Sequence, residues 1–443
     1  MRVLDTLGMM SNSADEPMNE PDVRLNSGLA EQTTTVVMVA FACEPGRGSE
    51  PGVGYEFARG LAMLAKQNHW RAVLLTRTHR LDRIRAELKK EGLDGHIRLE
   101  GLAIPLSLVA TTKRRHVRVA ALYWQLAAVR YLRHLAGAME GPIIVHHVTF
   151  ASEFLPTFEW LLPPRVLRIF GPAGSAQTGN RISQRRSGVL LRESLSRLNL
   201  RRVDLAVAQN TDSARRWSPN CLRTVVEPNV VVHRTDLDAA HYHQRHSLRV
   251  KDGFGRWSTE STDGCLLTVG LLVKRKRHHL AIQALAKAAN PHLRLFIVGG
   301  GVLERDLMEQ ARSIGVANRV FFTGQLTKQQ VFAAMANARV LIHSSRQEGA
   351  GWVVGEAQSF GLPAIAVRGC GSDTVVELGG IGEVVDNNRD ESVLAQSIAG
   401  AVDRILASKS TYQPSTRWLD SRIPGLLEQW YRAALGEGAE SES

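Results

Sequence analysis

The stretch from residue 338 to 363 constrains the fold more than any other, because it joins three local signals in a fixed order. Residues 338–343 (Ala-Arg-Val-Leu-Ile-His) form a short apolar run, the pattern of a buried strand. Gly349 and Gly351 then open a turn, and residues 352–360 predict a helix that Gly361 ends before Pro363. A strand, a glycine-containing turn and a helix in this order predict part of a parallel α/β sheet.

Two carboxylates, Glu348 and Glu356, flank the expected start of this helix. Backbone N–H groups at a helix N-terminus lack partners within the helix and form an anion site that suits a diphosphate. If the helix begins near Gly351, Glu356 lies about 7 Å further along its axis, where its carboxylate can accept two hydrogen bonds from a vicinal diol such as a ribose. Glu348, on the loop, can meet a second polyhydroxylated group. The stretch therefore predicts a sugar-nucleotide site; the alternative, two glutamates on a solvated helix, is disfavoured by the flanking sequence.

Composition bounds the class of protein. A chain of 443 residues exceeds one ordinary hydrophobic core, which favours two domains. The apolar runs are shorter than the ~20 residues that span a bilayer, and residues 1–35 are too polar for a signal peptide. Four cysteines without metal or redox spacing fit a reducing cytoplasm (Cys43, Cys221, Cys265 and Cys370). The net charge of +12 points to an anionic partner: nucleic acid, a membrane surface or a phosphorylated substrate.

The same alternation of apolar runs and helical segments fills both halves of the chain and predicts two doubly wound parallel sheets. The predicted strands are residues 34–42, 71–76, 97–104, 142–148, 165–170 and 204–208, then 265–272, 293–299, 319–323, 340–344, 363–367 and 383–385. The predicted boundaries are a disordered tail (1–33), an N-terminal domain (34–228), a linker (229–262), a C-terminal domain (263–420), and a C-terminal helix with a disordered tail (421–443).

Three further segments follow predicted strands, at the sheet edge where α/β sites form. The loop from Glu44 to Gly54 is rich in glycine and lets backbone approach a phosphate or sugar closely, although its spacing is not that of a dinucleotide fingerprint. His147 follows a strand of the first domain, and Arg275 and Lys276 follow the first strand of the second, where they could neutralise a departing diphosphate. The alternatives are a tight turn, a structural histidine and a solvated basic turn.

Two basic stretches lie in the first half. No acidic residue occurs between Gly101 and Met139, a span that includes a basic segment with Tyr123 and Trp124, and residues 181–202 carry six further arginines after Arg181. A basic helix with an apolar and aromatic face favours an anionic lipid surface, and a solvated helix face is the alternative. Nucleic-acid binding is not expected, because aromatic platforms among the basic residues are almost absent.

Taken together, these segments resemble a known family. Two Rossmann-like sheets facing a central cleft, with the phosphate site on the second, resemble the GT-B architecture. Three segments look like those of family 4 retaining glycosyltransferases: residues 348–356, Arg275-Lys276 and residues 298–301. Three others are similar to a bacterial subgroup that builds surface polysaccharides: residues 44–54, His146-His147-Val-Thr and Gly171-Pro-Ala-Gly.

The resemblance implies roles for individual residues. Of the two implied catalytic residues, His147 would contact the sugar near its anomeric carbon and Glu348 would bind the sugar's hydroxyls. Glu356 would bind the nucleotide ribose. The remaining donor-binding residues are Gly351, Trp352 and Val353 through their amides, Arg275 and Lys276 through their charges, and Gly52 and Gly54 through close approach from the first domain. Transfer with retention is implied, the leaving phosphate oxygen receiving the acceptor's proton, with no metal or other cofactor required.

The sequence departs from the family pattern at three positions: Leu271 stands where arginine is usual, Ala350 where a large apolar residue is usual, and Gln177 where an acidic one is common. We expect a cytoplasmic glycosyltransferase, peripherally bound to the inner face of the cell membrane. It would move a hexosyl group from a nucleotide sugar, with GDP- or UDP-sugars favoured, to a lipid-linked or glycan acceptor in exopolysaccharide or cell-surface glycan assembly. The alternatives are a sugar-nucleotide epimerase of the same fold and a non-catalytic protein that binds sugar nucleotides or polyanions.

Overall fold

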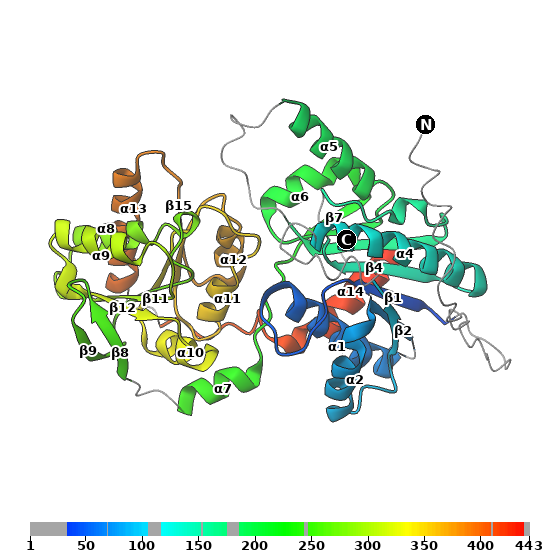
Figure 1. Cartoon of the computed structure of the whole chain (residues 1–443), viewed down its shortest axis with the longest axis horizontal. Helices are drawn as coiled ribbons and strands as arrows, with labels where there is room; N and C mark the ends of the chain where they lie inside the picture. The colour runs from blue at the N-terminus through cyan, green and yellow to red at the C-terminus, as the bar shows by residue number, and fades with distance from the viewer. Residues whose placement is uncertain are drawn as a thin grey trace.

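The structure is a computed structural model that describes residues 33–68, 70–104, 117–151, 154–174, 186–242, 247–408 and 411–437. The predicted N-terminal tail (1–33), apart from its last residue, lies outside the described residues, as do the last six residues of the predicted C-terminal tail, Gln177 and the basic residues just before Val117. Two sheets, each flanked by helices, form two lobes (Figure 1).

The N-terminal lobe holds a seven-stranded sheet of order β3-β2-β1-β4-β5-β6-β7, and all of its neighbouring strands run parallel. Its strands are β1 (Thr35–Ala40), β2 (Arg71–Arg77), β3 (Arg98–Leu102), β4 (Ile143–Thr149), β5 (Val166–Ala173), β6 (Leu205–Ala208) and β7 (Arg223–Val226). Its helices are α1 (Ser49–Asn68), α2 (Leu81–Lys90), α4 (Val117–Ala138), α5 (Arg186–Leu200) and α6 (Thr211–Trp217).

Strand β1 shows why this sheet needs helices on both sides. Every residue of Thr35–Ala40 is buried. Val36 and Met38 pack with α1 and α2 on one face, whereas Val37 and Val39 pack with α4 on the other. A strand covered on both faces is apolar throughout rather than alternating, which is the pattern that made it predictable.

The C-terminal lobe holds an eight-stranded sheet of order β15-β14-β13-β10-β11-β12-β8-β9. Its strands are β8 (Ser247–Asp252), β9 (Trp257–Ser261), β10 (Leu266–Val269), β11 (Leu295–Val298), β12 (Val320–Gly324), β13 (Val340–His343), β14 (Ala364–Val367) and β15 (Gly382–Val385). Six of these run parallel, and β8 and β9 are antiparallel additions at one edge. Helices α8 (His278–Lys287), α9 (Glu304–Ser313) and α13 (Glu391–Ala407) cover one face, and α10 (Lys328–Asn337), α11 (Trp352–Gln358) and α12 (Ser372–Gly379) cover the other.

The fold class is confirmed: two α/β domains with doubly wound sheets are present, and each predicted strand overlaps an observed one. The predicted linker 229–262 is wrong over its second half, because β8 and β9 form a hairpin on the second sheet. Within its first half, α7 (Arg234–Tyr242) packs on α10. The sequence did not reveal the hairpin because a strand with one buried face needs few apolar residues; in β8 these are Leu248 and Val250.

The chain crosses between the lobes twice, and the two crossings lie side by side. Val232 N–H donates to the Trp418 carbonyl at 2.7 Å, and Asp420 N–H donates to the Val232 carbonyl at 3.0 Å. Val231 belongs to the core of the first lobe, whereas Val230 and Val232 belong to that of the second. After the second crossing, α14 (Ile423–Leu435) packs against α1, so the C-terminal helix returns to the N-terminal lobe (Figure 1).

Candidate active site

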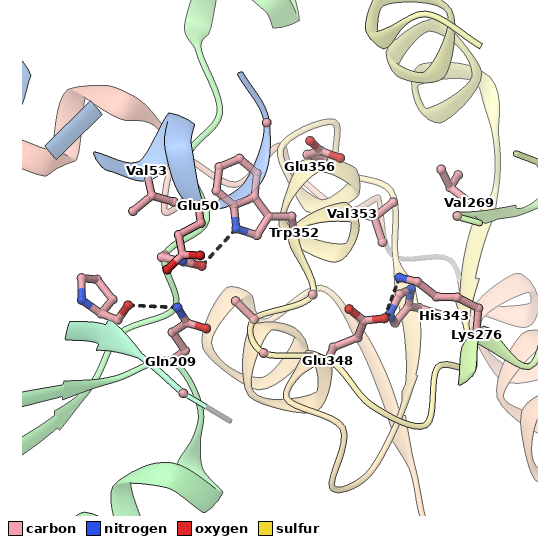
Figure 2. Close-up of a pocket in the computed structure, with 18 of the residues that line it drawn as sticks. Glu50, Val53, Gln209, Val269, Lys276, His343, Glu348, Trp352, Val353 and Glu356 are labelled. Carbon is pink, nitrogen blue, oxygen red and sulfur yellow. Dashed lines mark hydrogen bonds and ion pairs between the residues drawn. The ribbon is translucent and has the colours of Figure 1, made fainter. Parts of the chain in front are cut away.

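A cavity of about 1010 Å³ lies between the two lobes and is lined from both sides. Figure 2 shows both walls, with Glu50 and Gln209 of the first lobe on one side and Glu348, Lys276 and His343 of the second lobe on the other. The C-terminal wall is formed by Val269, Gly270, Lys276, Leu326, Lys328, Val331, Phe332, His343, Glu348, Gly349, Ala350, Gly351, Trp352, Val353 and Glu356. The N-terminal wall is formed by Gly48, Glu50, Val53, Arg118, Val148, Phe150, Ala151, Phe154, Leu155, Pro172, Gly174, Gln209 and Asn229.

The loop between β13 and α11 joins the two walls. The Asn210 side-chain amide donates to the Gly349 carbonyl at 2.9 Å, and the Trp352 indole N–H donates to Asn229 Oδ1 at 3.0 Å. A Cβ at position 349 would lie 2.8 Å from Gln209 Oε1, so Gly349 lies against the Gln209 side chain of the first lobe. The loop is therefore held between the domains and cannot be displaced without breaking contacts to both.

Helix α11 begins at Trp352, as predicted, with Gly351 at its N-cap. Gly351 has φ of +66°, and a Cβ there would lie 2.2 Å from Ser372 Oγ and 3.0 Å from the Ser372 Cα. Both the left-handed backbone and the crowding require glycine. The predicted residues Gly351, Trp352 and Val353 all line the cavity, where the first N–H groups of the helix have no acceptor within it.

Glu348 is the most heavily contacted carboxylate of the site. Its Oε1 lies 2.6 Å from Lys276 Nζ, 2.7 Å from Ser345 Oγ and 3.2 Å from Arg275 Nη1. Burial alone would raise the pKa of Glu348, but the charge of Lys276 and these hydrogen bonds hold that pKa below its ordinary value. The donors around Glu348 approach the same oxygen, and no hydrogen bond from the described residues reaches Oε2. That oxygen can accept a ligand hydroxyl.

Glu356 lies on α11 in a different environment. Burial raises its pKa to about 7, against an opposing effect of Lys328 and with a further increase from Asp236. Lys328 is itself engaged, with its Nζ 2.6 Å from Asp236 Oδ2. Among the described residues no donor makes a hydrogen bond to the Glu356 carboxylate, although it lines the cavity. Both of its oxygens are therefore available to a pair of hydroxyls.

The basic turn after β10 places its two predicted residues differently. Lys276 lines the cavity, whereas Arg275 does not and keeps about half of its side chain exposed while contacting Glu348. Leu271 is 52% exposed and also lies outside the cavity lining. Arg277, the next basic residue, is buried and donates to the Ser344 carbonyl at 2.8 Å, which is a structural role.

His147 does not fit its predicted place. Its imidazole is wholly buried and absent from the cavity lining: Nδ1 lies 2.6 Å from Glu159 Oε1, and Nε2 lies 3.1 Å from Gln125 Nε2. Because the amide nitrogen of Gln125 can only donate, His147 Nε2 accepts from it and His147 Nδ1–H donates to Glu159. Alternate strand residues face opposite sides of a sheet, so His147 points toward α4 and its neighbour Val148 lines the cavity.

Gly52 and Gly54 are also absent from the cavity lining. A Cβ at Gly52 would lie 2.0 Å from the Arg47 carbonyl oxygen, and one at Gly54 would lie 2.2 Å from the Ala42 carbonyl oxygen. Both glycines let α1 begin tightly against its own loop and the end of β1. The residues of the same segment that line the cavity are Gly48, Glu50 and Val53.

Several lining residues escaped the sequence prediction: Glu50, Arg118, Gln209, Asn229, Lys328 and His343. Glu50 accepts a hydrogen bond from the Phe150 N–H, and burial raises its pKa above the ordinary value. Gln209 directly follows β6 and donates to the Pro172 carbonyl at 2.9 Å. Its position after a predicted strand was the one signal that could have found it.

No group of three or more His, Cys, Asp and Glu side chains that could hold a metal ion occurs within the part of the chain that the structure describes. The pair Asp236 and Asp238 on α7 is no exception: Asp236 is bound to Lys328, and Asp238 lies 3.6 Å from Arg234. The charged groups available at the cavity are therefore the lysines, arginine and glutamates described above.

Residues 254–413 match the family described as glycosyl transferases group 1. The match covers β9 through α13, with both glutamates and the basic turn. The C-terminal lobe is a group 1 glycosyl transferase domain. The resemblance to family 4 glycosyltransferases is thereby confirmed for this lobe, and the match begins inside the segment that was predicted as a linker.

Two relatives and one solved structure show how far this likeness extends. The lipopolysaccharide core biosynthesis glycosyltransferase LpsE of Rhizobium meliloti is 29% identical over 170 residues, which cover 38% of this chain and 46% of LpsE. The GDP-mannose-dependent alpha-(1-6)-phosphatidylinositol monomannoside mannosyltransferase of Mycolicibacterium smegmatis is 34% identical over 131 residues, covering 28% of this chain and 34% of that enzyme. The chain thus spans less than half the length of these relatives. The Anabaena protein HepE in complex with UDP has a TM-score of 0.54 at 16% identity, covering 90% of this chain and all of HepE, which shows a common GT-B fold.

Proposed function

We propose that this chain is a retaining glycosyltransferase that moves a hexosyl group from a nucleotide-diphosphate sugar to a lipid-linked or glycan acceptor. The observation that carries the proposal is the arrangement at the start of α11. There Glu348, Lys276 and Glu356 line one cavity around the first amides of a helix, which have no acceptor within it, in a group 1 domain that faces a second lobe. The helix amides and Lys276 can bind one anionic group, and each glutamate can bind one polyhydroxylated group. A sugar nucleotide contains these three groups.

The donor would lie along α11. Glu356, with both carboxylate oxygens available, would accept from the ribose hydroxyls. The amides of Gly351, Trp352 and Val353 would bind the diphosphate, with Lys276 beside it and Arg275 contributing through its contact with Glu348. Glu348 would use Oε2 for the transferred sugar. A likeness in fold to HepE, whose structure contains UDP, supports a nucleotide in this cleft.

Transfer would proceed with the acceptor hydroxyl on the face of the sugar from which the diphosphate departs. The bond from C1 to the phosphate oxygen breaks, the acceptor oxygen bonds to C1, and the departing phosphate oxygen takes the acceptor's proton. Lys276 and the helix end stabilise the growing charge on the leaving group. We propose that no metal ion is required for this step, so that turnover should survive chelation with EDTA.

The surface of helix α4 supports an acceptor at a membrane. Helix α4 carries no acidic residue, and three of its apolar side chains at helical spacing are exposed: Val119 (52%), Tyr123 (45%) and Leu126 (48%). The same helix exposes Arg118, Arg130 and Arg133. Trp124, which we expected on this face, is fully buried. An exposed apolar stripe with arginines fits an anionic lipid surface, and Arg118 connects it to the cavity lining.

We therefore place the protein in the cytoplasm, peripherally bound to the inner face of the membrane, in exopolysaccharide or cell-surface glycan assembly. None of the described helices is long and apolar enough to cross a membrane. Co-sedimentation with vesicles containing about 30% phosphatidylglycerol tests this surface. Tyr123→Ser combined with Leu126→Ser should weaken binding about tenfold, whereas Trp257→Ser, which removes an exposed aromatic residue of the other lobe, should not. Equal binding by all three proteins would contradict the α4 surface.

Thermal stabilisation by UDP-, GDP-, TDP- and ADP-sugars, without added metal, tests the donor site. One nucleotide should raise the melting temperature, and Glu356→Ala should abolish that increase. An assay with a pool of bacterial glycolipids then tests transfer. If no nucleotide sugar stabilises the wild type, the proposal fails.

A second candidate is a protein that binds sugar nucleotides without transferring the sugar. It is favoured by Leu271, which removes a cation that the family usually carries near the diphosphate. A nucleotide sugar that binds through Glu356 but is neither transferred nor hydrolysed would support this candidate. Conversion of the bound sugar into its epimer without an acceptor would instead support an epimerase of the same fold.

A further inference from the structure

His343, the last residue of β13, is a buried cavity residue without a hydrogen-bond partner for one of its nitrogens. It lines the cavity with 3% of its surface exposed. Its Nε2 is enclosed and has no partner among the described residues. A buried nitrogen that could donate or accept, but does neither, costs free energy, so this position has a reason other than packing.

The acceptor that His343 Nε2 could reach is Glu348 Oε1, which lies 4.0 Å away. Figure 2 shows His343 beside the Lys276–Glu348 ion pair. A gap of 4.0 Å is about 1 Å too long for a hydrogen bond, which is a distance that a small rotation of the Glu348 side chain on its loop can close. At present Lys276, Ser345 and Arg275 occupy the space around Oε1.

The protonation state of His343 suits a neutral donor. Burial, followed by the charge of Lys276, lowers the pKa of His343 to about 3. The imidazole is therefore neutral and carries one N–H. The carboxylate of Glu348 favours that hydrogen on the nitrogen facing it, which is Nε2.

A diphosphate in the cavity changes the balance around Glu348. Lys276 would then face two anions, the carboxylate at 2.6 Å and the phosphate, and its contact with Glu348 would lengthen as its charge is shared. Glu348 would lose its closest donor at the moment when it must hold the sugar. His343 Nε2–H is the donor placed to replace it.

We propose that His343 is a positioning residue for Glu348: its Nε2–H donates to Oε1 when a diphosphate engages Lys276, which keeps Oε2 aimed at the hydroxyls of the transferred sugar. The inference rests on the proposed function, and it adds a residue that determines how well the sugar part of the donor is held. His343 is not required for binding the nucleotide itself.

Two variants separate the donor function of His343 from its volume. His343→Leu removes the N–H, and His343→Gln keeps an N–H donor in a similar volume. Calorimetry measures the affinities for two pairs of ligands: UDP with UDP-glucose, and GDP with GDP-mannose. The values of kcat and KM are then measured with the nucleotide sugar of the pair that binds. The expected result for His343→Leu is an unchanged nucleoside diphosphate affinity, an about tenfold weaker nucleotide-sugar affinity and a lower kcat. His343→Gln should restore most of both losses.

A matched control uses His278, a buried histidine of the same lobe. Both of its nitrogens have partners: Nδ1 lies 3.0 Å from Thr268 Oγ1, and Nε2 lies 3.2 Å from the Leu271 carbonyl oxygen. His278→Leu should lower the melting temperature while leaving the ratio of sugar-nucleotide to diphosphate affinity unchanged. If His343→Leu lowers both affinities equally, or changes neither, the positioning role is overturned although the proposed function stands. If the wild type binds no nucleoside diphosphate or nucleotide sugar, those of TDP and ADP included, the proposed function fails and the inference fails with it.

Discussion

The two walls of the cavity hold their polar groups in opposite ways. On the C-terminal wall Lys276 and Glu348 stand 2.6 Å apart and Glu356 lies on the following helix. On the N-terminal wall the residues expected to act lie behind the surface: His147 is enclosed by Glu159 and Gln125. The N-terminal surface is made instead by side chains that include Glu50, Phe150 and Gln209.

The difference shows what fixes a site. A strand, a turn and a short helix (β13 to α11) carry both glutamates of the C-terminal wall, Glu348 and Glu356, so their spacing in the sequence already specifies their geometry. The N-terminal wall is assembled from loops that follow different strands and meet only in the folded domain. Its predicted residues contribute to the packing of that domain. We therefore expect changes on the N-terminal wall to affect mainly stability, and changes on the C-terminal wall to affect mainly donor binding.

The largest expected effect concerns stability on the N-terminal side. His147→Leu removes the donor to Glu159 and leaves that carboxylate buried without its partner, which should cost about 3 kcal/mol of unfolding free energy. Nucleotide affinity should change by less than about twofold, because the imidazole does not reach the cavity. Chemical denaturation and calorimetry measure the two quantities. A stable variant with much weaker donor binding would restore His147 to the site and erase the contrast between the walls.

On the C-terminal side the matching change is Glu356→Gln. Replacing the carboxylate weakens two hydrogen bonds to the ribose, so the Kd for the nucleotide sugar should rise about 100-fold. Stability at pH 8 should increase by about 2 kcal/mol, because the raised pKa means that the charged form is disfavoured by burial. Calorimetry and denaturation at pH 8 check both results, and a destabilised variant would show that Glu356 serves the fold.

The sequence predicted the sheets well because both are buried on two faces, which leaves continuous apolar runs such as Val36–Val39 and Val340–Ile342. It missed β7, β8 and β9, which lie toward the edges, where partial exposure admits polar residues and dilutes the pattern. The return of α14 to the first lobe joins segments of the chain that are far apart in sequence, as between Asn68 and Glu428, 360 residues apart, and no local pattern encodes it.

For the site, the structure places six of the predicted residues at the cavity: Glu348, Glu356, Lys276, Gly351, Trp352 and Val353. Their roles stay predictions. His147, Gly52 and Gly54 lie outside the cavity lining, because position at the end of a strand does not tell which face a side chain takes, nor whether a glycine is needed for packing. His343 escaped notice since it reads as part of an apolar run. Only the distances to Glu348 and the absence of a partner for Nε2 among the described residues distinguish it.

A smaller effect should appear as a pH dependence of donor affinity. The pKa of Glu356 is raised from 4.5 to about 7 by burial, with Lys328 opposing and Asp236 adding to the shift. Its contribution to stability is therefore fully present below pH 4.5 and is lost as the pH rises through about 7. Donor affinity should change in the opposite direction and be about tenfold weaker at pH 6 than at pH 8, since the ribose needs the ionised carboxylate. Calorimetry with a nucleotide sugar at both pH values tests this, and Glu356→Gln should show no such dependence.

The smallest effect should come from restoring a charge beside the C-terminal wall. Leu271 follows Gly270, which lines the cavity, and is itself half exposed. Leu271→Arg would add a guanidinium near the diphosphate, but solvent screening limits an exposed pair to about 1 kcal/mol, a two- to fivefold gain in affinity. The gain should shrink at 0.5 M salt, whereas an arginine introduced at Leu222, exposed in the other lobe, should give none. A gain of 100-fold would show that position 271 closes onto the ligand, and a loss would mean that Lys276 alone sets the diphosphate's place.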